Sequence, residues 1–255
     1  MKNLFFLAVI LTAVHIYPQI PSGEINKILD NINFQSQRQE QLQKNLKNYK
    51  YKQFIHFIKM DGDDEIEEQS KREYHIYVKS DSVRKRELLS ALIFEDGEWK
   101  NISEEEKANN KEKHSESKSF SLSEMVGPDN RKNYAFEIIG DEFIEPWETV
   151  HIRAKAIEED EDRFQGDLWF EKENYSLVKA QLQPSEMPTF VDEMNMYFEM
   201  QQMDSLWFPQ KIEFDAEVGI LFLFSGKIHS EITFSEFEFD QQFNETWFNN
   251  LDNAE

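Results

Sequence analysis

The sequence contains no cysteine, which excludes disulfide bonds, thiolate metal sites, a thiol nucleophile and lipid attachment through an N-terminal cysteine. Glycine and proline are scarce, with 8 and 7 residues, so the chain is neither collagen-like nor a flexible linker. Basic residues are outnumbered, because 28 Lys and Arg stand against 50 Asp and Glu and give a net charge of −22. Nucleic acids and anionic membrane surfaces are bound mainly through cationic patches, so the sequence argues against both as partners.

Apolar and aromatic residues are abundant in spite of this acidic balance. The 255 residues are 39% hydrophobic and 14% aromatic, and they include 22 Phe. Intrinsically disordered chains lack this amount of apolar surface, so we expect a folded protein with a sizeable core. We assign residues 20–255 to a single domain.

The N-terminus has the layout of a secretory signal peptide. Lys2 precedes an apolar run over residues 4–14, and a charged start followed by roughly 7–15 apolar residues is typical of such signals. The run is shorter than the roughly 20 residues that span a bilayer. We therefore predict that residues 1–19 are a signal peptide, cleaved between His15 and Ile20. The alternative is an uncleaved anchor or a buried first helix.

This pattern predicts an exported protein that is not integral to a membrane. The absence of cysteine fits the periplasm or the exterior of a bacterium better than an extracellular animal module, which is usually rich in disulfides. We expect a periplasmic location, with secretion as the alternative.

The order of hydrophobic patterns predicts a mainly β fold. Apolar residues recur at i, i+3, i+4 and i+7 from Ile25 to Ile32, which indicates an amphipathic helix. From Tyr49 onward the segments are rich in aromatic and β-branched residues and are separated by turn signals. We predict a curved antiparallel half-barrel sheet of about eight to eleven strands, covered by one or two helices.

Two capping boxes and a turn mark the element boundaries. Ser103 with Glu106, and Ser121 with Glu124, have the spacing of a helix N-terminus in which two side chains satisfy free backbone N–H groups. Asp96-Gly97 indicates a tight turn between strands. Residues 101–119 form a highly charged segment between the strands.

The clearest strand pattern runs from residue 211 to residue 224. Charged residues alternate with apolar ones from Lys211, which predicts one long strand with Gly219 at a bend or bulge. Residues 194–200 repeat the pattern one strand earlier. The apolar sides of the two segments define a hypothetical ligand cavity, made of Met194, Met196, Phe198, Met200, Phe214, Ile220, Phe222 and Phe224.

No recognisable constellation of catalytic or metal-binding residues occurs in the sequence. The six histidines are scattered, without the spacing of a metal site, and there is no Gly-x-Ser-x-Gly elbow or glycine-rich phosphate loop. Carboxylate pairs carry no information in a chain with 50 acidic residues. We predict no catalytic residues, no metal and no cofactor.

Several short motifs resemble those of exported bacterial proteins that share the half-barrel of the lipoprotein carrier LolA and its relatives. The most specific is residues 166–180, with Gly-Asp-Leu-Trp-Phe followed by Tyr-Ser-Leu-Val-Lys. Residues 205–209, Ser-Leu-Trp-Phe-Pro, and residues 234–237, Phe-Ser-Glu-Phe, follow in the family's order. The resemblance covers about residues 24–240 and implies the half-barrel fold, with Trp169 and Trp207 packing strands or lining a cavity.

Three function hypotheses follow from the patterns and the resemblance. The first is a non-catalytic exported protein that binds a lipid-like ligand or a lipoprotein acyl chain in the concave face, because Met and Phe side chains adapt to flexible apolar ligands. The second is a ligand-free cell-envelope interaction module whose acidic surface meets a basic envelope protein. The third is an envelope hydrolase. Ordinary packed core is the alternative to an open cavity.

Overall fold

The computed structural model describes residues 22–79, 83–109, 122–220, 224–243 and 246. The eleven strands in these residues form one sheet in the order β4-β3-β2-β1-β11-β10-β9-β8-β7-β6-β5. All neighbouring strands are antiparallel, so the mainly β prediction is confirmed, at the upper end of the expected strand number. The strands are β1 (Tyr49–Asp61), β2 (Ile66–Lys79), β3 (Val83–Glu95), β4 (Glu98–Asn101), β5 (Tyr134–Ile144), β6 (Trp147–Ala156), β7 (Phe164–Glu171), β8 (Leu177–Pro184), β9 (Val191–Met203), β10 (Leu206–Ile220) and β11 (Phe224–Glu238).

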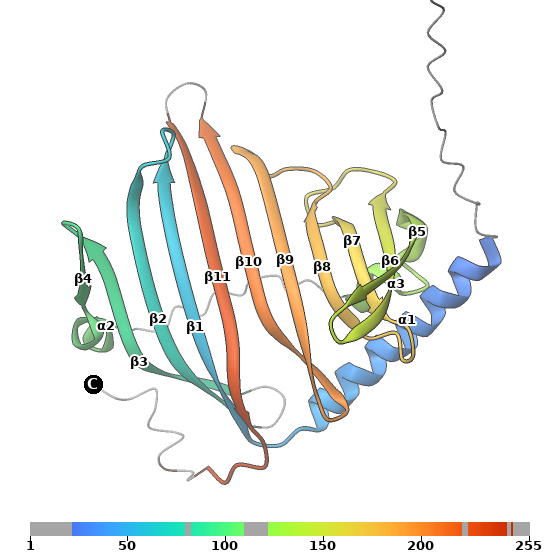
Figure 1. Cartoon of the computed structure of the whole chain (residues 1–255), viewed down its shortest axis with the longest axis horizontal. Helices are drawn as coiled ribbons and strands as arrows, with labels where there is room; N and C mark the ends of the chain where they lie inside the picture. The colour runs from blue at the N-terminus through green and yellow to red at the C-terminus, as the bar shows by residue number, and fades with distance from the viewer. Residues whose placement is uncertain (1–21, 80–82, 110–121, 221–223, 244–245, 247–255) are drawn as a thin grey trace, which may run out of the picture.

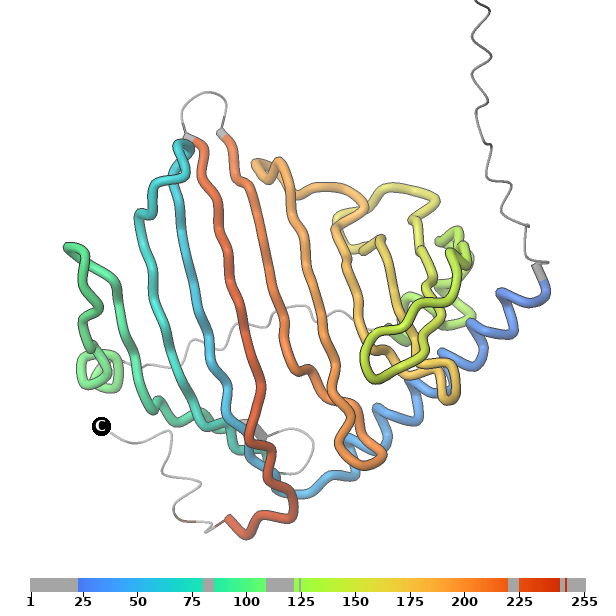
Figure 2. Tube along the Cα trace, viewed as in Figure 1, coloured from blue at the N-terminus to red at the C-terminus, as the bar shows by residue number. Residues whose placement is uncertain are grey.

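The sheet is curved and open. Its first strand pairs with its last, because β1 lies beside β11 over eleven registered residue pairs (Figure 2). From this seam the sheet extends to β4 on one side and to β5 on the other. Figure 1 shows these two edge strands at opposite ends of the curved sheet, which leaves a half-barrel.

The long helix α1 (Ser22–Asn45) covers one end of the sheet (Figure 1). Leu29 and Ile32 are fully buried, which confirms the amphipathic stripe in the sequence. They pack with Val126 of the short helix α3 (Leu122–Val126) and with side chains of β6, β7 and β8 in the larger hydrophobic core. We call the face of the sheet that α1 covers the inner face and the opposite one the outer face.

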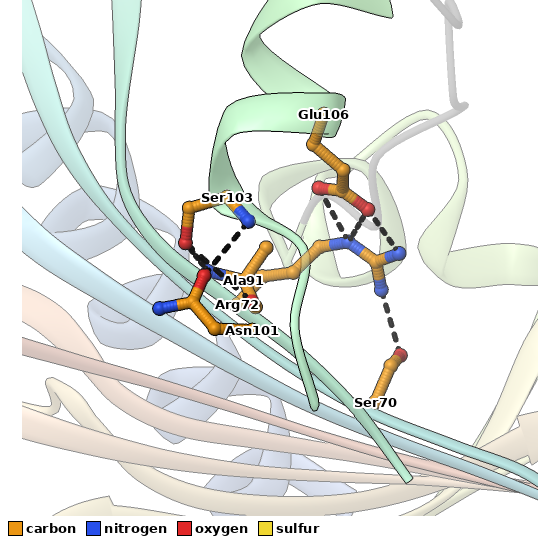
Figure 3. A network of polar contacts seen from close by, with 6 residues as sticks. All are labelled: Ser70, Arg72, Ala91, Asn101, Ser103 and Glu106. Carbon is orange, nitrogen blue, oxygen red and sulfur yellow. Dashed lines mark hydrogen bonds and ion pairs between the residues drawn. The ribbon is translucent and has the colours of Figure 1, made fainter. Parts of the chain in front are cut away.

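A second, smaller core lies on the inner face of β2 and β3. Tyr74, Ile76 and Leu88 are buried there, and Ile102 packs against them at the start of helix α2 (Ser103–Asn109). Arg72 on β2 donates from Nε to both oxygens of Glu106, at 2.9 and 3.1 Å, and from Nη1 to Ser70 Oγ at 2.7 Å (Figure 3). The network therefore fixes α2 to the sheet.

The capping box predicted for Ser103 and Glu106 is wrong. Ser103 Oγ accepts a hydrogen bond from the backbone N–H of Ala91 at 2.8 Å, and the Glu106 carboxylate binds Arg72 (Figure 3). A guanidinium offers a carboxylate two parallel donors, which makes a stronger contact than one backbone N–H. Residues of the sheet therefore bind both side chains, and neither side chain caps the helix. The second predicted box falls on Ser121, which lies outside the described residues, and on Glu124, whose side chain is not described.

The turn predicted at Asp96-Gly97 is confirmed between β3 and β4. Asp96 and Gly97 have φ angles of 55° and 84°, the left-handed conformation that a two-residue hairpin turn requires. Helix α3 ends at Val126, directly before Gly127-Pro128, where glycine and proline do not continue a helix.

The single strand predicted over residues 211–224 is wrong in its last part. β10 ends at Ile220 and β11 begins at Phe224, with the two residues paired across the hairpin. Phe222 lies outside the described residues. The alternation itself holds within β10, where Ala216 is buried and its neighbours Asp215 and Glu217 are exposed.

Candidate functional site

A pocket of about 280 Å³ lies on the inner face between α1 and strands β8 to β10. Its sheet side is largely apolar, whereas its helix side is polar. The apolar lining comes from Leu122, Tyr175, Leu177, Phe198, Met200, Trp207, Pro209 and Ile212, and the helix contributes Gln35, Ser36, Gln39, Glu40 and Gln43. A cleft with an apolar floor and a polar wall suits a ligand that has an apolar body.

Three glutamines of α1 connect the helix to the rim of this pocket. Gln35 donates to Ser176 Oγ at 2.9 Å, and both side chains are buried. Gln39 donates to the carbonyl of Ser205 at 3.0 Å and accepts from the N–H of Trp207 at 3.1 Å. Gln43 donates to the carbonyl of Trp207 at 2.8 Å. The hydrogen bonds hold the helix over the pocket.

Sequence reasoning missed these glutamines. They stand at i, i+4 and i+8 within a segment that looks only polar and glutamine-rich, and this spacing places them on one helix face. That periodicity is the signal that could have identified them. The apolar residues Leu122, Tyr175 and Leu177 were missed as well, because they come from short segments far apart in the sequence.

Four of the eight predicted cavity residues lie in β9, on the inner face. Phe198 and Met200 line the pocket, and Met196 and Phe198 pack against the larger core. Met194 lies further along the same face, opposite Ala216 of β10. The structure therefore brings part of the predicted set to one pocket.

The other four predicted residues lie in or beside the β10–β11 hairpin. Phe214 is partly buried and pairs with Met196, so it shares the inner face at a distance from the pocket lining. Ile220 and Phe224 are the last and first residues of the two strands, and their side chains are not described. Phe222 stands among the undescribed residues.

The two tryptophans of the family-like motifs lie in different surroundings. Trp207 is buried, lines the pocket and packs on Trp147 with ring centroids 5.1 Å apart. Trp169 is buried too, but its indole N–H donates to Glu142 at 2.7 Å and its ring stacks on His151. Trp169 therefore packs between neighbouring strands, and Trp207 forms part of the pocket lining.

The apolar lining continues across the inner face beyond the pocket. Phe198 of β9 pairs with Ile212 of β10, Ile212 pairs with Ile232 of β11, and Ile232 pairs with Ile55 of β1. Residues directly opposite one another on neighbouring strands share a face of the sheet. We call these four partly buried residues the apolar row.

Within the described residues, no group of three or more His, Asp or Glu side chains is arranged to hold a metal ion. A search of the same residues finds no helix with the length and apolar character needed to cross a membrane.

No family model matches the sequence, and no curated protein matches it. Solved structures do resemble the fold. An outer membrane lipoprotein-sorting protein domain from Vibrio parahaemolyticus is 12% identical, with a TM-score of 0.40, over 88% of this chain and 97% of that chain. A LolA superfamily protein from Nitrosomonas europaea is 10% identical, with a TM-score of 0.34, over 90% and 97%.

The MucA/MucB complex of Pseudomonas aeruginosa provides a third similar chain, 6% identical, with a TM-score of 0.27, over 86% of this chain and 100% of that chain. One of these similar structures is named as a member of the superfamily whose motifs the sequence resembles. Identities this low and TM-scores below 0.5 leave function to be argued from the chain's own residues.

Proposed function

We propose that this protein is a non-catalytic exported binding protein that takes up a lipid-like ligand or an acyl chain on its inner face. The observation that carries the proposal is the pocket of about 280 Å³ between α1 and the sheet, with its apolar floor. Phe198, Met200 and Ile212 from two neighbouring strands supply part of that floor. Thioether and aromatic side chains repack around flexible chains, so the floor suits acyl groups of varied structure.

The apolar row gives an acyl chain a path out of the pocket. Four neighbouring strands at a spacing of ~4.8 Å span roughly 14 Å from Phe198 to Ile55. Each methylene removed from water contributes about 0.8 kcal/mol, so a chain of ordinary length binds without a specific polar contact. The polar wall of α1 then faces the end of the ligand that carries its head group.

Export and location belong to the same proposal. The layout of residues 1–19, with Lys2 before an apolar run, supports a secretory signal and a periplasmic or secreted mature protein. Residues 20–255 would then act as one domain, which is consistent with the single sheet of the described strands.

A fluorescent apolar dye and a saturated fatty acid test the binding site. We expect the mature chain to bind N-phenyl-1-naphthylamine, and myristic acid to displace the dye and raise the melting temperature, because a ligand of the folded state stabilises it. Met200→Trp fills the pocket, so dye affinity should fall with little loss of stability. Met203→Trp, in the same strand but outside the pocket lining, is the matched control.

The opposite pattern would contradict the proposal. If Met200 is packed core, the added volume destabilises the fold by about 1–3 kcal/mol and there is no dye binding to lose. The net charge of −22 favours a second candidate in that case, an envelope interaction module that binds a basic protein. Binding to a basic partner that weakens with added salt, together with no lipid binding, would support that candidate.

A further inference from the structure

The pocket under α1 has one charged side chain in its lining. Among the lining residues in the part of the chain that the structure describes, Glu40 is the one acidic or basic residue, and the rest of the helix wall is neutral. Arg38 and Lys44 stand nearby on the same helix, but both are exposed and neither lines the pocket. The polar wall of the pocket therefore carries a negative charge without a cation beside it in the lining.

Glu40 is held at the rim by a hydrogen bond from the next helix along the chain. Ser123 of α3 donates from Oγ to Glu40 Oε1 at 2.6 Å. A carboxylate accepts several hydrogen bonds on its two oxygens, so one hydroxyl leaves acceptor positions for a ligand. Glu40 lines the pocket and is also exposed, so it acts on a ligand group that lies at the rim.

The far end of the apolar row does not offer a free cation either. Ile55, the last residue of the row, pairs with Arg72 of β2, but the guanidinium of Arg72 is bonded to Glu106 and to Ser70. Lys59, further along β1, lies 2.6 Å from a carboxylate oxygen of Glu67. An anionic head group at that end would have to displace a carboxylate that is already bound.

We propose that the inner pocket selects amphiphiles whose head group is cationic or a neutral hydrogen-bond donor over those whose head group is anionic, and that Glu40 is the specificity-determining residue. This inference rests on the proposed lipid-binding function, because it concerns the head group of that ligand. The carbon chain lies on the apolar floor, and the head group lies at the rim beside Glu40.

The three kinds of head group interact differently with the Glu40 carboxylate. An ammonium group donates a hydrogen bond and is attracted by the charge, a hydroxyl group donates without that attraction, and a carboxylate has no proton to donate and is repelled. The net charge of −22 acts in the same direction at longer range.

Competition for N-phenyl-1-naphthylamine on the mature chain tests the proposal with dodecylamine, dodecanol and dodecanoic acid, which share one chain length. We expect the amine to displace the dye most readily, the alcohol next and the acid last, with about tenfold between amine and acid. Glu40→Gln should reduce that ratio to about threefold or less. Its amide oxygen still accepts from Ser123, so the fold should be retained, and the urea midpoint checks this.

Glu24→Gln is the matched control, because it removes the same charge from the first turn of α1, outside the pocket lining. Glu24 is roughly 24 Å from Glu40 along the helix at 1.5 Å per residue, so the ratio of amine to acid should not change. Raising the salt concentration from about 0.02 M to about 0.5 M should shrink the wild-type ratio, because salt screens an exposed charge.

The possible failures of the two proposals can be told apart. Dye that binds but is displaced by none of the three ligands overturns both the lipid-binding function and the head-group preference. Displacement by all three with equal affinity, or a ratio that Glu40→Gln leaves unchanged, overturns the preference alone. Amine binding that persists in Met200→Trp, which fills the pocket, would place the amine on the acidic surface and overturn the preference as well.

Discussion

Gln43 donates a hydrogen bond from Nε2 to the backbone carbonyl of Trp207 across 2.8 Å, and so ties the last turns of α1 to the start of β10. The contact joins two residues 164 positions apart in the chain. Trp207 itself is buried in the pocket lining, so the position of the helix and the shape of the pocket depend on one another.

The two hydrogen bonds of Gln39 allow the attachment of α1 to the sheet to be tested by one substitution. Gln39→Ala removes a donor to Ser205 and an acceptor for the N–H of Trp207, so we expect a loss of about 1–3 kcal/mol in the free energy of unfolding. Gln37→Ala is the control, because among the described residues Gln37 makes one hydrogen bond, an exposed one of 3.4 Å to Asn33 on the same helix. Urea denaturation of both variants measures the difference. Equal losses would show that the amide contacts do not hold the helix.

Ile32 and Phe34 of α1 allow the effect of burial on stability to be measured apart from the effect of side-chain size. Ile32 is 0% exposed in the larger core, so Ile32→Ala should destabilise by about 2–5 kcal/mol through lost burial and a cavity. Phe34 is larger but 69% exposed, and Phe34→Ala should change stability by under about 0.5 kcal/mol. Thermal and urea unfolding give both values. A greater loss for Phe34 than for Ile32 would contradict the described orientation of α1.

Local periodicity is sufficient to predict α1 and most strands. The apolar stripe from Ile25 to Ile32 and the alternation in β10 each depend on near neighbours in sequence. The helix forms as expected, and the predicted strand forms as far as Ile220. The turn at Asp96-Gly97 requires two residues with positive φ angles, and Asp followed by Gly adopts these angles readily. Such features could be predicted because the residues that decide them are adjacent.

The incorrect and missed features depend on distant partners. Glu106 lies in a perfect capping box, but Arg72, 34 residues earlier, takes its carboxylate. The run to Phe224 alternates without a strong turn signal, so it does not reveal that β11 starts there. The glutamines of α1 gain their role from Ser176, Ser205 and Trp207, which lie more than 100 positions away in the sequence. The pairing of strands across the sheet brings these residues together, and the register of that pairing cannot be derived from one sequence.

The signal peptide prediction can be checked on exported material. N-terminal sequencing of the protein from the periplasm or medium of an expressing bacterium should give a mature start between Ile16 and Ile20, because the apolar run ends just before. Replacing Leu7 with Arg should block export by breaking the apolar run, whereas Leu7→Ile should not. An intact Met1 in a membrane fraction would instead support an uncleaved anchor.

The stability of the protein should fall in mild acid through His56. Burial, followed by the charge of Lys71, lowers the pKa of His56 below its ordinary value of 6.5, and Gln69 Nε2 lies 2.9 Å from His56 Nε2, where the neutral ring accepts. The unfolded chain therefore binds the proton more readily than the folded one. The contribution of His56 is present above pH 6.5 and is lost as the pH falls through the folded-state pKa.

Urea midpoints at pH 7.5 and pH 5 measure this loss. We expect the wild-type midpoint to fall more between the two values than that of His56→Asn, whose side chain does not titrate but still offers Gln69 an acceptor. His151→Asn is the control, because His151 lies on β6 and five strands of the sheet separate it from His56 on β1. If the His56 variant loses as much stability in acid as the wild type, protonation of this ring is not what weakens the fold.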